Sequence, residues 1–173
     1  MFRTIRNSDR RTTRWKNGQG WTSEIALFPP DATLQTFDWR ISLAGTDCDA
    51  AFSQFPDIDR TLLLLAGRLT LKIEGRPDTN IGSESPPFLF PGNWNIDAKL
   101  HESPIMDFNV MTRRGRFVHS LDRQILMEPS NIELAADVTA AVSLRDGVQV
   151  TSGPSMETLN MHDAILLDRK SVV

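Results

Sequence analysis

Apolar and polar residues alternate with a period of two in three segments, Trp39–Leu43, Leu69–Glu74 and Asp107–Thr112. This pattern is typical of β-strands whose two faces meet different surroundings. Pro and Gly residues interrupt the chain at short intervals between these and other apolar runs. Many short strands separated by turns predict an all-β sandwich or barrel.

Evidence for helices is weak, because even the best window, Ile132–Ala141, is rich in Val, Thr and Ile and favours strands. The stretch Asp122–Asn131 is interpreted as the connection between a larger N-terminal part, residues 1–121, and a smaller C-terminal part, residues 122–173, of one compact unit. Ala141–Val150 and Thr158–Leu167 are predicted strands, so the second part is expected to repeat the first in abbreviated form.

The composition narrows the function classes. The net charge is −3 and the pI is near 5.6, which disfavours nucleic-acid binding because a phosphate backbone requires a basic surface. Cys48 is the single cysteine and has no partner for a disulfide, which fits a reducing, cytoplasmic setting. Residues 1–14 carry five arginines and no apolar segment, and no run approaches the length of a spanning helix, so no membrane association is expected.

The segment Trp15–Ile25 combines a lysine, an asparagine, two glycines and a glutamate around two tryptophans. Such a mixture is poorly suited to a core and indicates a shaped loop that leads into a strand. Lys16 and Glu24 could form an acid and base pair if burial shifted their pKa values, or could form a simple salt bridge.

Arg40 and Ser42 share one face of a predicted strand, and this face points either to solvent or into a barrel lumen, where the pair would suit a carboxylate. Arg60 lies immediately before the largely apolar run Thr61–Leu65. It is either a solvated charge at a turn or a second cation at a barrel mouth. Asp107, Asn109 and Met111 project from one face of a later strand.

Phe88–Trp94 is predicted to be a tight turn with aromatic side chains that form a wall. Arg114 and Arg116 are interpreted as ordinary solvated charges. His101, His119 and His162 are far apart in sequence, which argues against a metal site, and no serine or cysteine hydrolase motif is present.

Six motifs in this order resemble the HutD/Ves family, and they lie in Trp15–Gly18, Thr22–Ile25, Phe37–Ser42, Phe52–Arg60, Phe90–Gly92 and Asp107–Arg113. The resemblance implies a bicupin-like (RmlC-like jelly roll) fold, with two small antiparallel β-barrels of which the second is degenerate. It also implies a metal-free pocket without a cofactor and an association with bacterial histidine utilisation or stress responses.

Carried onto this chain, the resemblance places the following residues around the pocket: Lys16, Asn17, Glu24, Arg40, Ser42, Arg60 and Asn109, with Phe90 and Met111 as apolar wall. Arg40 and Arg60 would bind a carboxylate, Asn17 and Asn109 would orient it, and Glu24 would accept a hydrogen bond from a ring or amide N–H. A cluster with this excess of buried cations requires a counter-anion, which a small anionic metabolite would supply.

Three hypotheses follow. The first is a binding protein for a carboxylate of histidine breakdown, of the urocanate or formylglutamate type, with a regulatory or ancillary role. The second is a metal-free isomerase or hydrolase that uses Lys16 or Glu24 as acid or base. The third is a protein-interaction module with a large exposed apolar patch. A homodimer through open sheet edges is compatible with each.

Overall fold

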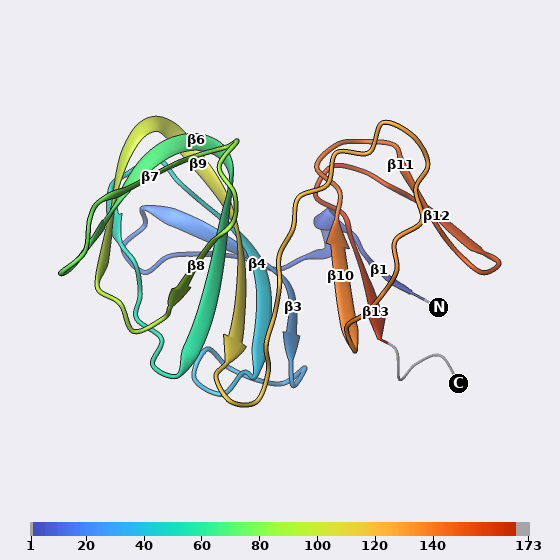
Figure 1. Cartoon of the computed structure of the whole chain (residues 1–173), viewed down its shortest axis with the longest axis horizontal. Helices are drawn as coiled ribbons and strands as arrows, with labels where there is room; N and C mark the ends of the chain where they lie inside the picture. The colour runs from blue at the N-terminus through green and yellow to red at the C-terminus, as the bar shows by residue number, and fades with distance from the viewer. Residues whose placement is uncertain (1, 169–173) are drawn as a thin grey trace. The chain divides into compact units, whose positions relative to one another are not determined.

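The computed structural model describes residues 2–168, which form β-strands and one short 3-10 helix, η1 (Asn7–Asp9) (Figure 1). The chain divides into two units, one made of residues 11–124 and the other of residues 1–10 and 125–173. The first ten residues therefore group with the C-terminal unit, whereas the sequence placed them in the N-terminal part. Their strand β1 pairs with the last described strand, β13, and this pairing explains the difference.

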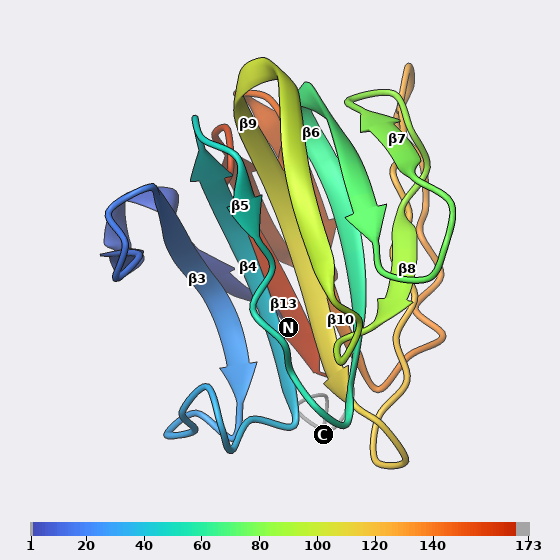
Figure 2. The same cartoon turned by 90° about the vertical axis from the view of Figure 1, so that its left-hand side faces the viewer.

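The unit of residues 11–124 is one antiparallel sheet of eight strands in which β2, β3, β4, β9, β6 and β7 lie side by side in that order, while β5 pairs with β9 and β8 with β6 (Figure 2). The bounds of these strands are β2 (Thr12–Arg14), β3 (Gly20–Phe28), β4 (Trp39–Thr46), β5 (Ala50–Ala51), β6 (Ile58–Ile73), β7 (Thr79–Gly82), β8 (Phe88–Pro91) and β9 (Ile96–Arg113).

The long strands β6 and β9 each pair with more than one neighbour, and their mutual register shifts between Leu64 and Leu69. Such irregularities bend a strand and increase its twist, so the sheet coils around an apolar core. The core contains Leu62, Leu64 and Phe90 together with residues farther along β6 and β9. A smaller apolar cluster contains Phe37, Ile58 and Met111.

The other unit contains a three-stranded sheet in the order β1-β13-β10 and a two-stranded hairpin of β11 and β12 (Figure 1). Their bounds are β1 (Arg3–Ile5), β10 (Val138–Val142), β11 (Val148–Ser152), β12 (Ser155–Leu159) and β13 (Ala164–Asp168). This unit has fewer and shorter strands than the first, as expected for a degenerate second barrel.

The all-β class and the absence of a long helix among the described residues confirm the sequence-based prediction. Two strand predictions in the C-terminal part are wrong in extent. Residues 141–150 and 158–167 were each expected to form one strand, but turns between β10 and β11 and between β12 and β13 divide them. Residues 88–91 form a strand where a turn was predicted, and the turn follows it.

Candidate functional site

A band of polar side chains crosses the sheet of the first unit on the face that also carries the core residues Leu62 and Leu64. Cross-strand pairing aligns Glu24, Ser42, Asn109 and Leu62 in one row, and Arg40, Met111 and Arg60 in the next. Residues directly opposite each other on antiparallel strands point to the same face. We call Glu24, Arg40, Ser42, Arg60, Asp107 and Asn109 the polar strip. Arg60 in this strip lies against rings of both apolar groups, Phe52 and Phe90 of the core and Phe55 of the smaller cluster.

Arg60 is the most deeply buried cation of the polar strip, with 6% of the residue exposed. Its guanidinium carbon lies over three aromatic rings, at 5.3 Å from the centroid of Phe52, 5.5 Å from Phe55 and 5.0 Å from Phe90. Its Nη1 donates a 3.1 Å hydrogen bond to the carbonyl oxygen of Ser53, but its buried Nε has no acceptor.

Burial lowers the pKa of Arg60 to about 10, with Asp107 opposing the shift and Arg40 adding to it. The side chain is therefore still cationic at neutral pH. Among the residues that the structure describes, no carboxylate forms an ion pair with Arg60. A cation in this state favours an added anion, because a buried charge without a partner is costly.

Arg40 and Glu24 form an ion pair, with 3.2 Å between Nε and Oε2. The Arg40 side chain is 11% exposed and that of Glu24 is 38% exposed, so the polar strip reaches solvent at β3. Glu24 thus has Arg40 as its partner, whereas the sequence had considered a pair with Lys16.

Asp107 lies on β9, two residues before Asn109, and is a member of the strip that the predicted site omitted. It is 8% exposed, and burial raises the pKa of its carboxyl to about 7 against the opposing effects of Arg60 and of a hydrogen bond from Asn109. The period-two pattern had already put Asp107 on the same strand face as Asn109 and Met111. Its own burial, which sets it apart from ordinary surface aspartates, appears only in the folded chain.

Lys16 and Asn17 do not join the polar strip. They are exposed at the tip of the hairpin between β2 and β3, where Asn17 exchanges hydrogen bonds with Gln19 through its amide and its side-chain oxygen. Gly18 has a φ of +73°, and a Cβ on Gly20 would lie 2.7 Å from the Trp15 ring. The glycines thus serve the turn and the close packing of Trp15, whose Nε1 donates to Thr22.

The structure therefore brings together six of the nine predicted residues directly, namely Glu24, Arg40, Ser42, Arg60, Asn109 and Met111. Phe90 on β8 lies opposite Arg60 and forms part of its aromatic surroundings. Lys16 and Asn17 lie at the far end of β3.

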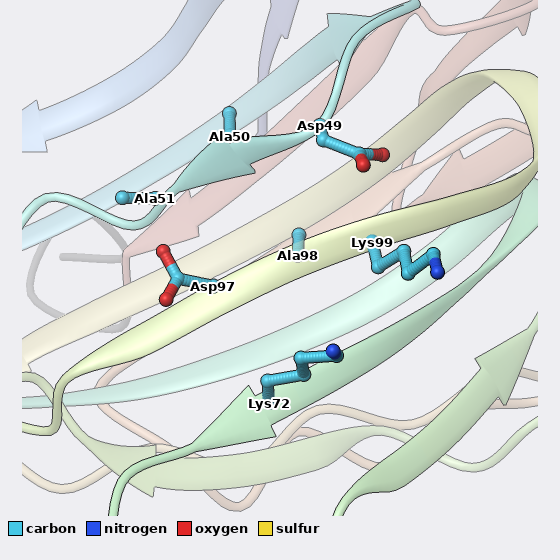
Figure 3. A pocket seen from close by; sticks show the side chains of 7 residues that line it. All are labelled: Asp49, Ala50, Ala51, Lys72, Asp97, Ala98 and Lys99. Carbon is cyan, nitrogen blue, oxygen red and sulfur yellow. The ribbon is translucent and has the colours of Figure 1, made fainter.

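A surface depression of about 310 Å³ lies elsewhere, over β5, β9 and β6 (Figure 3). Figure 3 shows two lysines, Lys72 and Lys99, and two aspartates, Asp49 and Asp97, around it. All four are exposed, and the two charges of each sign balance. Water satisfies such groups, so this depression has none of the buried, unpartnered polar atoms that distinguish the strip.

Within residues 2–168, no group of three His, Cys, Asp or Glu side chains is placed to hold a metal. The side chains of His101 and His119 have other contacts. His119 bridges the hydroxyls of Thr61 and Thr112 through its two ring nitrogens, each at 2.8 Å, and His101 contacts Thr70. The described residues also contain no helix long and apolar enough to cross a membrane.

The coiled antiparallel sheet with a polar strip beside its apolar core defines a cupin-like all-β protein, and the reduced second unit makes it bicupin-like. The chain belongs to the HutD family, whose model matches residues 7–173. This membership confirms the resemblance drawn from the six sequence motifs.

Related sequences and structures agree. Over 103 residues, the chain is 38% identical to protein Ves of Citrobacter koseri and 35% identical to protein Ves of Cronobacter sakazakii. These matches cover 59% of this chain and 53% and 55% of the relatives, so the chain spans about half the length of the curated relatives it matches.

Two solved structures are similar over almost the whole chain. HutD from Pseudomonas fluorescens SBW25 is 26% identical to this chain, with a TM-score of 0.76. The match covers 97% of this chain and 88% of the HutD chain. A conserved protein of unknown function from Pseudomonas aeruginosa PAO1 is 22% identical with a TM-score of 0.75, over 97% of this chain and 87% of its own. The second likeness concerns the fold alone.

Proposed function

We propose that this HutD-family chain binds a small carboxylate metabolite on the polar strip, without a metal. The observation that carries the proposal is Arg60, a buried cation with an unused Nε donor and no ion-pair partner among the described residues. A guanidinium presents several N–H donors in a fixed plane, and this geometry matches the two oxygens of a carboxylate.

The neighbours of Arg60 support an anion at this position. Arg40 adds a second cation on the other side of β9, since both arginines lie opposite Met111. Its charge is shared with Glu24, so the positive charge that is not neutralised is concentrated at Arg60. The three aromatic rings around Arg60 hold the guanidinium in place, which reduces the entropy lost when a ligand binds.

The association of the HutD family with histidine utilisation suggests which carboxylates to examine. Urocanate and N-formylglutamate are small and anionic, and both carry a second polar group away from a carboxylate. A strip that combines a cation with other polar side chains suits such molecules. The biological role of such binding would be regulatory or ancillary. The enzyme hypothesis gains no specific support, because Lys16 lies at an exposed hairpin tip and Glu24 is paired with Arg40.

Calorimetric titration of urocanate and N-formyl-L-glutamate into the native chain and into Arg60→Met tests the proposal. Methionine retains an apolar stem among the aromatic rings and removes the charge. Loss of a hydrogen bond to a charged group, about 1.5–3 kcal/mol, should weaken binding by at least about tenfold. Arg68→Met is the matched control, because Arg68 is on the same strand but has a side chain that is 62% exposed.

Native-like binding is expected in Arg68→Met. The proposal fails if the native chain binds neither acid at millimolar concentration, or if Arg60→Met binds both as tightly as the native chain does. Circular dichroism of each variant confirms that the fold is retained.

A further inference from the structure

Two buried oxygen atoms of the polar strip lack hydrogen-bond donors. They are Oδ1 of Asp107 and Oδ1 of Asn109, in residues that are 8% and 6% exposed. The Asn109 side chain is close enough to the Asp107 carboxyl to act on its pKa, and neither Oδ1 has a hydrogen-bond partner. A buried acceptor without a donor costs about 1–3 kcal/mol. Two such oxygens on neighbouring residues therefore indicate a position where another molecule supplies the hydrogen-bond donors.

These oxygens lie at a defined distance along the sheet from the cationic part of the strip. Asp107 precedes Met111, the residue opposite both arginines, by four positions on β9. At about 3.3 Å per residue, the two rows are about 13 Å apart at the backbone. The long Arg60 side chain shortens this gap, since its charge acts on the Asp107 carboxyl.

Arg60 is the charged group that acts on the Asp107 carboxyl, and the other charged groups of the strip lie on β4 and β3. Arg60 on β6 and Arg40 on β4 are cationic, and Glu24 on β3 is paired with Arg40. No ion pair links Arg60 to Asp107 among the described contacts. The strip consequently has one end that donates hydrogen bonds, at Arg60 Nε, and one end that accepts them, at Asp107 and Asn109.

We propose that Asp107 and Asn109 determine specificity by accepting a hydrogen bond from the ligand, so that the site selects carboxylates that also carry an N–H or O–H donor. This assignment rests on the proposed function, in which Arg60 holds the carboxylate. It extends that function to a chemical class: acids with a neutral N–H in a ring or amide, or with a hydroxyl, at the end remote from the carboxylate.

Two matched acids test the assignment. Urocanate carries a ring N–H, and 3-(2-furyl)acrylate has the same acrylate chain and a five-membered ring without any donor. Titrations at about pH 8, well above the pKa of an imidazole, keep both rings neutral. A site that hydrogen-bonds a ligand donor strongly rejects the analogue that lacks it. We therefore expect the native chain to bind urocanate at least tenfold more tightly.

Variants at Asp107 locate the preference. Asp107→Leu removes the acceptor at similar size and should abolish the preference for urocanate, whereas Asp107→Asn retains an oxygen and should preserve part of it. Asp97→Asn, on the same strand but exposed, is the control and should behave as the native chain does.

The outcomes separate the two proposals. If the native chain binds both acids equally, water alone satisfies the two oxygens and the specificity assignment is wrong, while the carboxylate function stands. A preference that persists in Asp107→Leu also overturns the assignment. If neither acid binds to the native chain, both proposals fail. The comparison of two acids on the native chain holds even where a variant does not fold.

Discussion

Asp107 in the unit of residues 11–124 and Asp163 in the other unit are both buried, but the surroundings of the two carboxylates are opposite. Asp163, in the unit of residues 1–10 and 125–173, is 4% exposed and accepts three hydrogen bonds: from Arg6 Nη1 at 3.0 Å, from the backbone N–H of Asn7 at 2.8 Å and from the backbone N–H of Asn160 at 3.0 Å. Asp107, in the unit of residues 11–124, is 8% exposed and has a free oxygen.

The pKa values of the two carboxyls follow from these contacts. Burial acts to raise the pKa of Asp163, but the amides of Asn7 and Asn160 and the Arg6 guanidinium together lower it below the ordinary value. At Asp107 burial prevails over Arg60 and Asn109, and the pKa rises to about 7. Burial alone therefore does not distinguish a structural carboxylate from one in a binding site. The number of hydrogen-bond donors around the carboxylate does.

The comparison assigns a structural role to Asp163. Its donors Arg6 and Asn7 belong to the N-terminal segment, and its donor Asn160 belongs to the turn before β13. This carboxylate therefore links the N-terminal segment to the C-terminal part of the same unit. Asp107 has no comparable set of donors, which is the physical reason for our proposal that it belongs to a binding site.

The largest expected effect is on stability in Asp163→Ala. The substitution leaves the Arg6 cation and two amides without their acceptor, which should lower the free energy of unfolding by about 3 kcal/mol. Urea denaturation followed by fluorescence and circular dichroism measures it. Glu157→Ala is the control, because Glu157 contacts Arg6 at 2.6 Å but both side chains are 36% exposed, and it should cost less than about 1 kcal/mol.

The effect of Asp163→Ala should also depend on pH. A carboxyl whose pKa is lowered by folding stabilises the protein fully above its unfolded pKa, and this contribution disappears as the pH falls through the folded pKa. The stability gap between native chain and variant should therefore shrink on acidification. A gap that is constant down to the acid transition would contradict the structural role.

The second prediction concerns Asp107→Asn, which should stabilise the protein by roughly 2 kcal/mol at about pH 8, because the native chain must bury an ionised carboxylate there. Folding raises the pKa of this carboxyl to about 7, so native stability should fall as the pH rises from the unfolded pKa, about 4, to about 7. The variant should lack this part of the pH dependence.

Thermal and urea unfolding between about pH 4 and pH 8 provide the measurement, with the exposed Asp97→Asn as control. If Asp107→Asn is destabilised at every pH, Asp107 is a satisfied structural carboxylate like Asp163, and the contrast between the two units disappears.

A smaller effect is expected for Glu24→Gln, which breaks the ion pair with Arg40 at the partly exposed end of the strip. Since Glu24 is 38% exposed, solvent screens the pair, and the stability change should stay below about 1 kcal/mol. Anion affinity should increase, because Arg40 regains its full charge beside Arg60. Titration with urocanate checks this, and a decrease in affinity would show that Glu24 itself contacts the ligand.

The smallest effect is expected for Lys16→Ala at the tip of the β2–β3 hairpin. The side chain is exposed, so stability should change by less than about 0.5 kcal/mol and ligand affinity should be unchanged. Parallel unfolding and titration experiments measure both. Weaker binding by this variant would show that the hairpin tip contacts the ligand, which contradicts its position outside the polar strip.

Much of the polar strip was accessible from the sequence, because alternation on a strand specifies which residues share a face. Arg40 with Ser42, and Asn109 with Met111, were grouped in this way, and the folded sheet places all four on one face. The Trp15–Gln19 loop had no such periodicity to constrain it, and its unusual composition serves the turn at Gly18 and the packing of Trp15.

The sequence by itself determined the all-β class, the family, and the faces of β4 and β9, since these depend on local patterns and on motif order. Only the tertiary structure decided that Glu24 pairs with Arg40, that Arg60 forms no ion pair with a described residue, and that Asp107 and Asp163 differ. Pairing and burial arise from residues far apart in sequence, and the balance between desolvation and available donors exists only when these residues meet.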